Sequence, residues 1–424
     1  MNKTGIILNQ VLEKVKPSEK EIKNIQKLVD GFLARLQQKI KKLKISAEIF
    51  VGGSFAKNTM IKKDLYDIDV FLRFEKKYPN EKISKLTLNI LKGFKNISKV
   101  HGSRDYFKIK LNPNTYLELV PVKKVKSTKE SENITDLSYS HVTYVKRKIK
   151  NKKLLDEIRI AKAFCYANNC YGAESYINGF SGYALELLVF YYGGFLKFIK
   201  AMIKIKNKTI IDIEKHHKTK QAVLMDLNSS KLNSPIILID PTYKQRNALA
   251  ALSNETFEKF QKVCESFLKT PSLKLFELKK TDIEKIKRES EKKKYEFILL
   301  ETFTKKQSGD IAGSKLLKFY KHLEKEINKF FEIKNKGFQY NKKQASKFFF
   351  VLTPKKEIIL KGPKKEDKKN VSKFKKKHKN TFIKGKNIYS KEKIKENIKD
   401  FIEKWMIKNK EKIKEMYITK LEIL

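Results

Sequence analysis

Two short motifs that lie close together constrain the fold of this chain most strongly. Val51-Gly52-Gly53-Ser54 closes a short apolar run, and Asp67-Ile68-Asp69 opens another. We expect a strand, a glycine turn, a helical segment over residues 55–61 and a second strand over residues 66–72. Because side chains alternate between the two faces of a strand, Asp67 and Asp69 point the same way.

The two motifs together favour a metal ion beside a phosphate. Two neighbouring carboxylates repel each other unless a cation lies between them, which suits a divalent metal. The turn leaves backbone N–H groups of Gly53 and Ser54 free at a helix start, which is a natural phosphate cradle. Such a turn alone is more often only a turn, and an exposed Asp-x-Asp is more often solvated surface. The apolar flanks, where charges are costly, favour the chemistry of nucleotidyl transfer.

A third acidic residue falls on another predicted strand. We expect strands over residues 106–111 and 115–122, joined by Asn112-Pro113-Asn114. Glu118 has apolar neighbours on its strand, so it is either an edge-strand charge or an acid with a function. In the second case Asp67, Asp69 and Glu118 would form a three-carboxylate metal site.

The net charge of +49 calls for a polyanionic partner. Nucleic acid is the first candidate and an anionic membrane the second, although a lysine-rich proteome would supply part of the same bias. The three cysteines form no C-x-x-C pair and the six histidines are scattered, so a disulfide framework and a zinc site are not expected. This cysteine usage fits a reducing cytoplasm.

We expect no membrane span and no signal peptide. The longest apolar run, residues 184–199, is interrupted by Glu186, Gly193-Gly194 and Lys197. Ser18 and Glu21 form a capping-box signature for an amphipathic helix that reaches about residue 44 and packs on the first domain.

The rest of the chain divides into a mostly helical middle and a mixed C-terminal part. A helix over residues 154–167 and an apolar helix from Ala184 are expected in the middle. A strand over residues 235–239 precedes Arg246-Asn247, and a helix begins near Ala248. Residues 355–386 are strongly basic and form either an RNA-backbone surface or a solvated face. The last amphipathic helix carries an apolar stripe that packs on the C-terminal domain.

Several motifs follow one another along the chain: Gly53-Ser54-Phe55-Ala56-Lys57, Asp67-Ile68-Asp69, the block from Tyr171-Gly172 to Gly182-Tyr183, Asp240-Pro241 with Arg246-Asn247, and Gly362-Pro363. In these motifs the sequence resembles a known family, the archaeal-type CCA-adding enzymes, which are tRNA nucleotidyltransferases of the polymerase-β-like superfamily. The resemblance covers nearly the whole chain, and the ordered combination of motifs is specific where each fragment is not.

The resemblance implies a role for each matching residue. Asp67, Asp69 and Glu118 are implied as the catalytic metal ligands, with Mg²⁺ as the cofactor. The third carboxylate is typically Asp in this family, which makes Glu118 a departure, and Lys57 stands where Arg is also found. The implied nucleotide contacts are Gly53, Ser54, Lys57, His141, Lys162 and Tyr171, together with Arg246 and Asn247.

From the residues alone these contacts have plainer alternatives. Lys162 would be a surface lysine with a buried stem, Tyr171 a core tyrosine and His141 an ordinary loop histidine. Arg246 and Asn247 can bind a base or a phosphate, and Asn247 can equally be only a helix N-cap.

We therefore predict a multidomain α/β (α+β) protein with a polymerase-β-like nucleotidyltransferase head. The expected domains are a catalytic head over residues 1–140, a central helical domain over 141–270 and an α+β tRNA-binding region over 271–424. The resemblance implies template-independent addition of C, C and A to the 3′ end of tRNA from CTP and ATP, by two-metal chemistry with release of pyrophosphate. It also implies a homodimer, and the cysteine usage favours a cytoplasmic location. The alternatives are a poly(A) or oligoadenylate polymerase on the same fold, and a non-catalytic RNA-binding protein.

Overall fold

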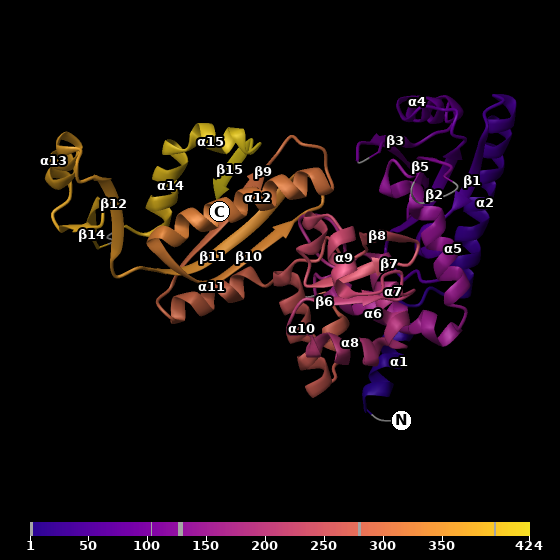
Figure 1. Ribbon diagram of the computed structural model, residues 1–424, viewed down its shortest axis with the longest axis horizontal. Helices are drawn as coiled ribbons and strands as arrows, with labels where there is room; N and C mark the ends of the chain where they lie inside the picture. The colour runs from indigo at the N-terminus through magenta and orange to yellow at the C-terminus, as the bar shows by residue number, and fades with distance from the viewer. Residues whose placement is uncertain (1–2, 103, 126–129, 279–280, 394–395) are drawn as a thin grey trace. The chain divides into compact units, whose positions relative to one another are not determined.

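The computed structural model describes residues 3–102, 104–125, 130–278, 281–393 and 396–424 and divides the chain into two compact units (Figure 1). The first unit spans residues 1–279 and the second spans residues 280–424. Among the described residues, the first unit holds two large apolar cores, which we call the head core and the central core, and a small cluster around Val223 and Ile237.

The head is built on a five-stranded sheet with the order β1-β2-β5-β4-β3. Strands β2 and β5 are parallel, and the other neighbours are antiparallel. Helix α2 begins with the predicted capping box and buries one apolar stripe against the sheet. The head elements are α2 (Glu19–Lys42), β1 (Ala47–Val51), α3 (Gly53–Ala56), β2 (Tyr66–Phe74), α4 (Asn80–Ile90), β3 (Ile97–Val100), β4 (Tyr106–Asn112) and β5 (Thr115–Lys123).

The central core is mainly helical and carries a small three-stranded sheet with the order β6-β7-β8. Helix α1 (Lys3–Val15) packs into this core although the head follows it along the chain. Helices α7 and α8 are separated by Gly193 and Gly194, which both have positive φ angles (71° and 128°). The remaining elements are η2 (Ile134–Leu137), α5 (Ser138–Lys148), α6 (Lys152–Ala167), α7 (Gly182–Tyr192), α8 (Phe195–Lys204), β6 (Thr209–Asp212), α9 (Lys220–Asp226), η3 (Ser229–Leu232), β7 (Ile236–Asp240), β8 (Tyr243–Asn247), α10 (Asn254–Lys269) and η4 (Leu273–Phe276).

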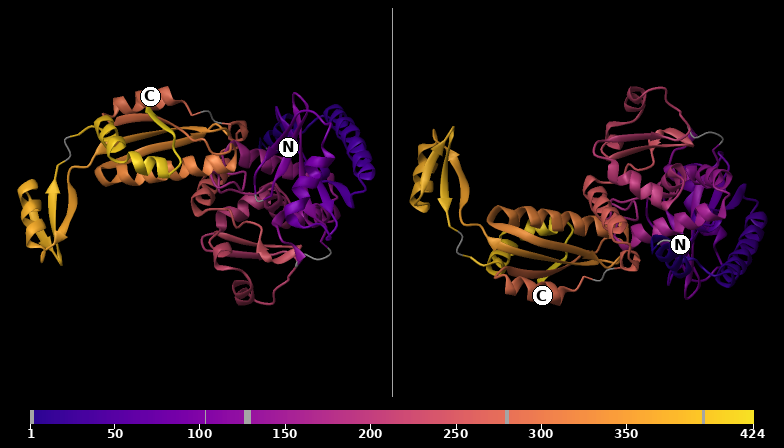
Figure 2. Two further views of the ribbon diagram at one scale, coloured as in Figure 1. Left: turned by 90° about the horizontal axis from the view of Figure 1, so that it is seen from above. Right: turned by 90° about the horizontal axis from the view of Figure 1, so that it is seen from below.

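The second unit contains a four-stranded antiparallel sheet, with the order β10-β11-β9-β15, and a smaller three-stranded sheet, with the order β12-β14-β13 (Figure 2). Helices α12 and α14 share one apolar core with the larger sheet. Its elements are α11 (Ile283–Lys292), β9 (Glu296–Phe303), α12 (Asp310–Phe330), β10 (Phe331–Tyr340), β11 (Ala345–Pro354), β12 (Ile358–Lys364), α13 (Lys368–Lys377), β13 (Thr381–Lys384), β14 (Asn387–Glu392), α14 (Ile398–Lys408), α15 (Lys410–Glu415) and β15 (Lys420–Ile423).

Two sequence-based expectations about helices are wrong. The helix expected over residues 55–61 ends at Ala56, because Asn58 adopts a left-handed conformation (φ 53°) that an α-helix does not continue. The helix expected near Ala248 is a turn, and α10 starts only at Asn254. The strands that contain Asp67, Asp69 and Glu118 are confirmed. The three-domain division stays a prediction, with α1 packed on the central core rather than on the head core.

The C-terminal amphipathic helix packs as expected. Ile398, Ile402 and Trp405 of α14 are buried in the core of the second unit. Within the part of the chain that the structure describes, none of the helices is long and apolar enough to cross a membrane.

Candidate active site

Three carboxylates gather where the parallel strands β2 and β5 run side by side. Asp69 is paired with Glu118 across the two strands. Asp67 lies two residues before Asp69 on β2, so both side chains are on the same face of the sheet. The opposite face of β2 supplies Ile68 and Val70, which are fully buried in the head core. The hydrophobic pattern of the strand therefore forces the two aspartates out of the core and next to Glu118.

A lysine ammonium group lies among these carboxylates. Lys108 on β4 is paired with Glu118, and its Nζ is 2.8 Å from Asp67 Oδ1 and 3.4 Å from Glu118 Oε1. Among the described residues, no three His, Cys, Asp or Glu side chains are already arranged to hold a metal ion together. In this structure the cation between Asp67 and Glu118 is the side chain of Lys108.

The carboxylates are electrostatically strained. Burial, followed by the charge of Asp69, raises the pKa of Glu118 to about 7. Burial also raises the pKa of Asp69, although the charge of Lys57 acts in the opposite direction. Crowded, partly desolvated carboxylates of this kind are oxygen donors that a hard divalent cation would relieve of their repulsion. The donor set therefore fits a divalent metal.

The glycine turn is fitted closely around Asp69. The backbone N–H of Gly52 donates to the Asp69 carbonyl (2.8 Å), and Gly53 has a φ of 61°. A Cβ atom placed on Gly53 would lie only 1.7 Å from Asp69 Oδ2. Gly53 is thus required both for its left-handed backbone and for the position of the carboxylate. Ser54 follows it in the single turn of α3.

Lys57 and Lys162 meet on a carboxylate that the sequence analysis did not select. Glu186 on α7 is fully buried, with Oε2 2.6 Å from Lys57 Nζ and Oε1 2.8 Å from Lys162 Nζ. The hydroxyl of Thr59 donates to Glu186 Oε1 at 2.6 Å. The two predicted phosphate contacts are therefore brought together, and Lys162 is a buried residue rather than a surface lysine.

Tyr171 packs at the start of helix α7, the helix that carries Glu186. Its hydroxyl oxygen is 2.7 Å from the position that a Cβ atom would take on Gly182 at the start of α7. Burial, followed by the charges of Glu186, Cys165 and Asp69, raises the pKa of the phenol. Tyr171 is therefore a neutral hydroxyl at the start of α7, near enough to Glu186 and Asp69 for their charges to act on it.

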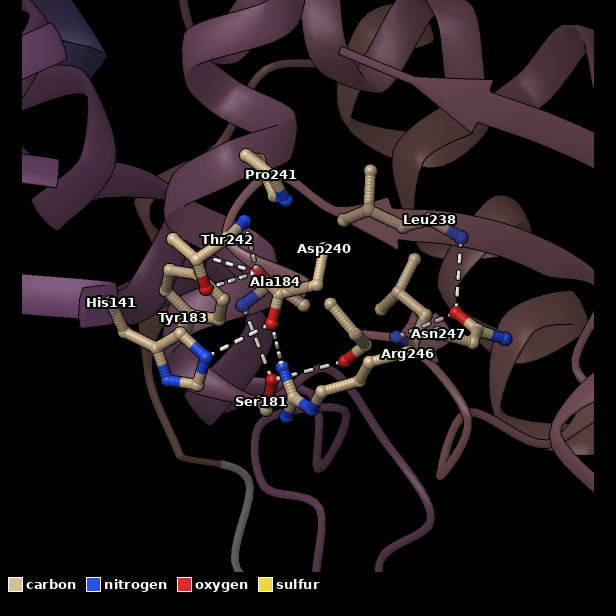
Figure 3. Close-up of polar contacts among 12 residues, drawn as sticks. His141, Ser181, Tyr183, Ala184, Leu238, Asp240, Pro241, Thr242, Arg246 and Asn247 are labelled. Atoms are coloured by element: carbon tan, nitrogen blue, oxygen red, sulfur yellow. Dashed lines mark hydrogen bonds and ion pairs between the residues drawn. The ribbon is translucent and has the colours of Figure 1, made fainter. Parts of the chain in front are cut away.

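A second polar cluster is centred on Asp240, at the end of β7 (Figure 3). Its Oδ2 contacts His141 Nε2 (2.9 Å) and Arg246 Nη1 (2.7 Å). Its Oδ1 accepts hydrogen bonds from the hydroxyls of Tyr183 (3.0 Å) and Thr242 (2.8 Å). Burial alone would raise the pKa of Asp240, but the hydrogen bond and charge of His141 and the charge of Arg246 outweigh it and lower the pKa.

Tyr183 connects the Asp240 cluster to the lysine pair. The imidazole of His141 stacks on its ring, with centroids 4.2 Å apart, and the guanidinium of Arg246 lies 5.9 Å from the ring centroid. Lys57 Nζ lies 6.0 Å from the same centroid. Burial lowers the pKa of His141 against the opposing effect of Asp240. Planar groups thus lie next to charged donors, which is a surface suited to a nucleobase.

Asn247 does not join this cluster. Its side chain is buried, and its Oδ1 accepts the backbone N–H groups of Leu238 (3.0 Å) and Leu249 (2.9 Å). Its Nδ2 donates to the carbonyl of Lys231 (2.8 Å). These bonds fix the end of β8 and the turn after it, so the residue has a structural role, and it is not the N-cap of a helix.

Several residues of the site were not predicted from the sequence. A signal existed for Glu186, which is a single charge inside an apolar run, and for Asp240 and Tyr183, which stand in the quoted motifs. No local signal distinguished Lys108 or Thr59, because their positions depend on strand pairing and on a contact distant in sequence.

Two protein-family models match overlapping parts of the first unit. The family model described as "Nucleotidyltransferase domain" matches residues 29–163. The model described as "tRNA nucleotidyltransferase, second domain" matches residues 156–277.

Curated relatives with the name CCA-adding enzyme align with much of the chain. The one from Nanoarchaeum equitans is 38% identical over 274 residues, which cover 64% of this chain and 67% of the relative. The one from Archaeoglobus fulgidus is 28% identical and covers 87% of this chain and 81% of the relative. The one from Pyrococcus abyssi is 32% identical and covers 63% of this chain and 60% of the relative.

Solved structures share the fold at low sequence identity. A cytoplasmic RNA terminal U-transferase aligns with a TM-score of 0.52 at 12% identity, over 66% of this chain and 100% of that chain. A poly(U) polymerase aligns with a TM-score of 0.51 at 13% identity, over 66% of this chain and 100% of that chain. Together with the match to the model described as "Nucleotidyltransferase domain", these alignments confirm the predicted mixed fold with a polymerase-β-like nucleotidyltransferase domain.

Proposed function

The chain belongs to the family of CCA-adding enzymes, and from this membership we propose that it adds C, C and A to the 3′ end of tRNA. CTP and ATP are the nucleotide substrates, no nucleic-acid template is read, and pyrophosphate is released. The observation that carries the proposal is that Asp67, Asp69 and Glu118 lie side by side on the neighbouring parallel strands β2 and β5.

In this proposal the three carboxylates hold divalent metal ions, for which Mg²⁺ is the expected species. Bound there, the metal supplies activation of the RNA 3′-hydroxyl and neutralisation of charge on the triphosphate. Lys108 must release Asp67 and Glu118 to make room, because its Nζ now lies between them. Gly53 leaves room for the carboxylate of Asp69, because a Cβ atom at this position would lie 1.7 Å from its Oδ2.

The triphosphate binds on the side of the lysine pair. Lys57 uses one contact on Glu186 and retains hydrogen-bond donors for a phosphate oxygen. Tyr171 provides a neutral hydroxyl, and Ser54 and Gly53 provide backbone N–H groups at the turn. Lys162 adds positive charge from a fully buried position. The cluster of Lys57, Lys162 and Glu186 carries one net positive charge, which favours an anionic ligand.

The nucleobase is read by the Asp240 cluster. Cytosine N3 and adenine N1 accept a hydrogen bond beside an amino group that donates one, whereas uracil and guanine present the reverse pattern. Arg246 carries only donors and is held by Asp240, so it is suited to the ring nitrogen. Asn247 does not bind the base in this proposal, because its side-chain amide is hydrogen-bonded to the backbone of Leu238 and Lys231.

The second unit binds the tRNA backbone in this proposal. Helix α13 contains no buried residue and carries lysines along its length, so it offers an electrostatic surface rather than a core element.

The proposal includes a homodimer, which light scattering would test. A cytoplasmic location belongs to it as well, because all three cysteines are free thiols.

A direct test is to incubate the protein with tRNA that lacks its 3′ terminal C, C and A, supplying one nucleotide triphosphate at a time or CTP with ATP, and to sequence the products. We expect two C and one A with CTP and ATP together, and no extension with UTP or GTP. Asp67→Asn should abolish the addition of C and of A alike while tRNA binding persists, because one metal site serves both.

The outcomes separate the proposal from its alternatives. Long adenosine tails from ATP alone would identify a poly(A) type of polymerase on this fold. Binding of tRNA without any incorporation would identify a non-catalytic RNA-binding protein. Loss of C addition with retained A addition in Asp67→Asn would refute a single metal site.

A further inference from the structure

We propose that Glu186 is a positioning residue that holds the ammonium groups of Lys57 and Lys162 together for binding of the nucleotide triphosphate. The inference deepens the proposed function and rests on it. Glu186 itself is fully buried on α7, and its role is to act through the two lysines.

The carboxylate divides its two oxygens between the lysines. Oε2 contacts Lys57 Nζ at 2.6 Å, and Oε1 contacts Lys162 Nζ at 2.8 Å. The hydroxyl of Thr59 also donates to Oε1 and in turn accepts a bond from Lys162 (2.8 Å). These contacts join the segment after α3 to helices α6 and α7, so a single side chain aligns the lysine from the head with the lysine from the central core.

Lys162 has no ammonium hydrogen left for a ligand in this arrangement. Its Nζ contacts Glu186 Oε1, Thr59 Oγ1 and the carbonyl of Thr59 (3.0 Å), which together use its three hydrogens. Lys57 makes its bond to Glu186 with one hydrogen. Lys57 is therefore the lysine prepared for direct contact with a phosphate, and Lys162 supports it through Glu186 and Thr59.

The two ammonium groups of Lys57 and Lys162 need the negative charge of Glu186 beside them. Two ammonium groups that converge in a buried space repel each other, and a fully buried lysine tends to lose its proton. Burial lowers the pKa of Lys162 to about 8, Glu186 opposes this effect, and Lys57 and Lys63 add to it. The carboxylate of Asp69 also interacts with Lys162. Burial would raise the pKa of Glu186, but Lys162 and Lys57 lower it to about 2, so Glu186 remains charged at neutral pH.

The test compares binding of CTP and of cytidine to the full-length protein by calorimetry between pH 6 and pH 9. In the unmodified protein, CTP affinity should fall as the pH rises through the pKa of Lys162, because the positive charge is present below that pKa and lost above it. In Glu186→Gln the fall should begin at a lower pH, since the interaction that raises this pKa is gone. At pH 8 we expect CTP binding to weaken about tenfold and cytidine binding to change little.

Two further variants make the test specific. Glu186→Asp retains the negative charge on a side chain that is shorter by one methylene group. The pH dependence of its CTP affinity should equal that of the unmodified protein, and its CTP affinity should be intermediate. Asp136→Asn is the matched control, because Asp136 is also a buried carboxylate that accepts from an arginine, Arg104, and from the backbone N–H of Lys123 (2.9 Å). It should lower thermal stability without moving the pH course of CTP binding.

The proposal is overturned if CTP affinity in Glu186→Gln depends on pH as it does in the unmodified protein. It is also overturned if Glu186→Gln weakens the binding of CTP and of cytidine equally. Should Glu186→Gln not fold, CTP affinity in Glu186→Asp equal to that of the unmodified protein would overturn it as well. Because no tRNA is present, these outcomes are independent of whether the protein adds C and A.

Discussion

Lys108 places its ammonium nitrogen 2.8 Å from Oδ1 of Asp67, so a side chain of the protein already neutralises part of the acidic site. A divalent metal bound by Asp67 and Glu118 must displace this charge. We expect Lys108→Gln to bind Mn²⁺ more tightly in the absence of nucleotide, by up to about tenfold, because competition by the ammonium group is removed. Titration followed by electron paramagnetic resonance measures free Mn²⁺ directly.

Lys110→Gln is the control for this substitution, since Lys110 is exposed and lies on the same strand. It removes the same formal charge without removing the contact to Asp67. Equal Mn²⁺ affinities in the two variants would show that Lys108 does not compete with the metal.

Gly53→Ala should inactivate the protein through Asp69. The added Cβ would lie 1.7 Å from Asp69 Oδ2, so the carboxylate must move, and the backbone conformation (φ 61°) also becomes strained. Gly385→Ala imposes the strain alone, because Gly385 has a φ of 59° and open space around its Cβ position. Each strain costs about 1 kcal/mol of unfolding free energy. We expect kcat for C addition to fall more than a hundredfold only in Gly53→Ala.

The comparison of thermal unfolding with kcat separates the two effects. Similar activity in both glycine variants would mean that the position of the Asp69 carboxylate is not critical.

Arg246→Ala should narrow nucleotide selectivity. Arg246 is held by Asp240 and lies close to Tyr183, at the place assigned to the base. Losing its hydrogen bond should cost about 1–3 kcal/mol in the use of CTP and ATP and leave the poor use of UTP nearly unchanged. Steady-state kinetics with the three nucleotides measure this. Lys244→Ala, on the same strand with half of its side chain exposed, should change none of the three.

The interpretation of the Arg246 experiment depends on the pattern of loss. An equal fall for CTP, ATP and UTP would assign Arg246 to phosphate binding or to folding instead of base recognition.

Lysines of α13 should set the salt dependence of tRNA binding. The helix buries none of its residues, so its charges are available to phosphates. Replacing four of them by Gln should reduce the slope of log affinity against log salt concentration by about one for each lysine that contacts a phosphate. The replaced residues are Lys368, Lys369, Lys375 and Lys376.

A matched set on α2 controls for the loss of net charge. Replacing Lys20, Lys23, Lys27 and Lys41, which are exposed, should leave the slope nearly unchanged. If both sets flatten the slope equally, the basic run on α13 is a solvated face and tRNA binds by overall charge.

Much of the head could be predicted because the signals for strand β2 and helix α2 each lie within a short stretch of sequence. The alternation around Asp67 and Asp69 specified a strand with one buried face, and the capping box at Ser18 specified where α2 begins. The same kind of signal failed at residues 55–61, where a left-handed Asn58 ends the helix. Single residues in unusual backbone conformations leave little trace in hydrophobic periodicity.

The partners of the site residues were beyond local prediction. Lys57 and Lys162 were selected as candidates, but the fully buried Glu186 between them comes from a distant helix. Asn247 was selected with Arg246 because they are neighbours in the chain, whereas their side chains serve different purposes. Pairing across the fold, and not residue type, decides these roles.

Helix α1 packs with the central core although the head follows it in the chain. Lys16 pairs with Asp156 at 3.0 Å, and the backbone N–H of Lys62 donates to the carbonyl of Val15 (2.7 Å). The head is therefore an insertion with two covalent tethers, not an appendage at one end. The chain crosses between the head core and the central core twice, so any change in the position of the head relative to the central core must be accommodated at both crossings.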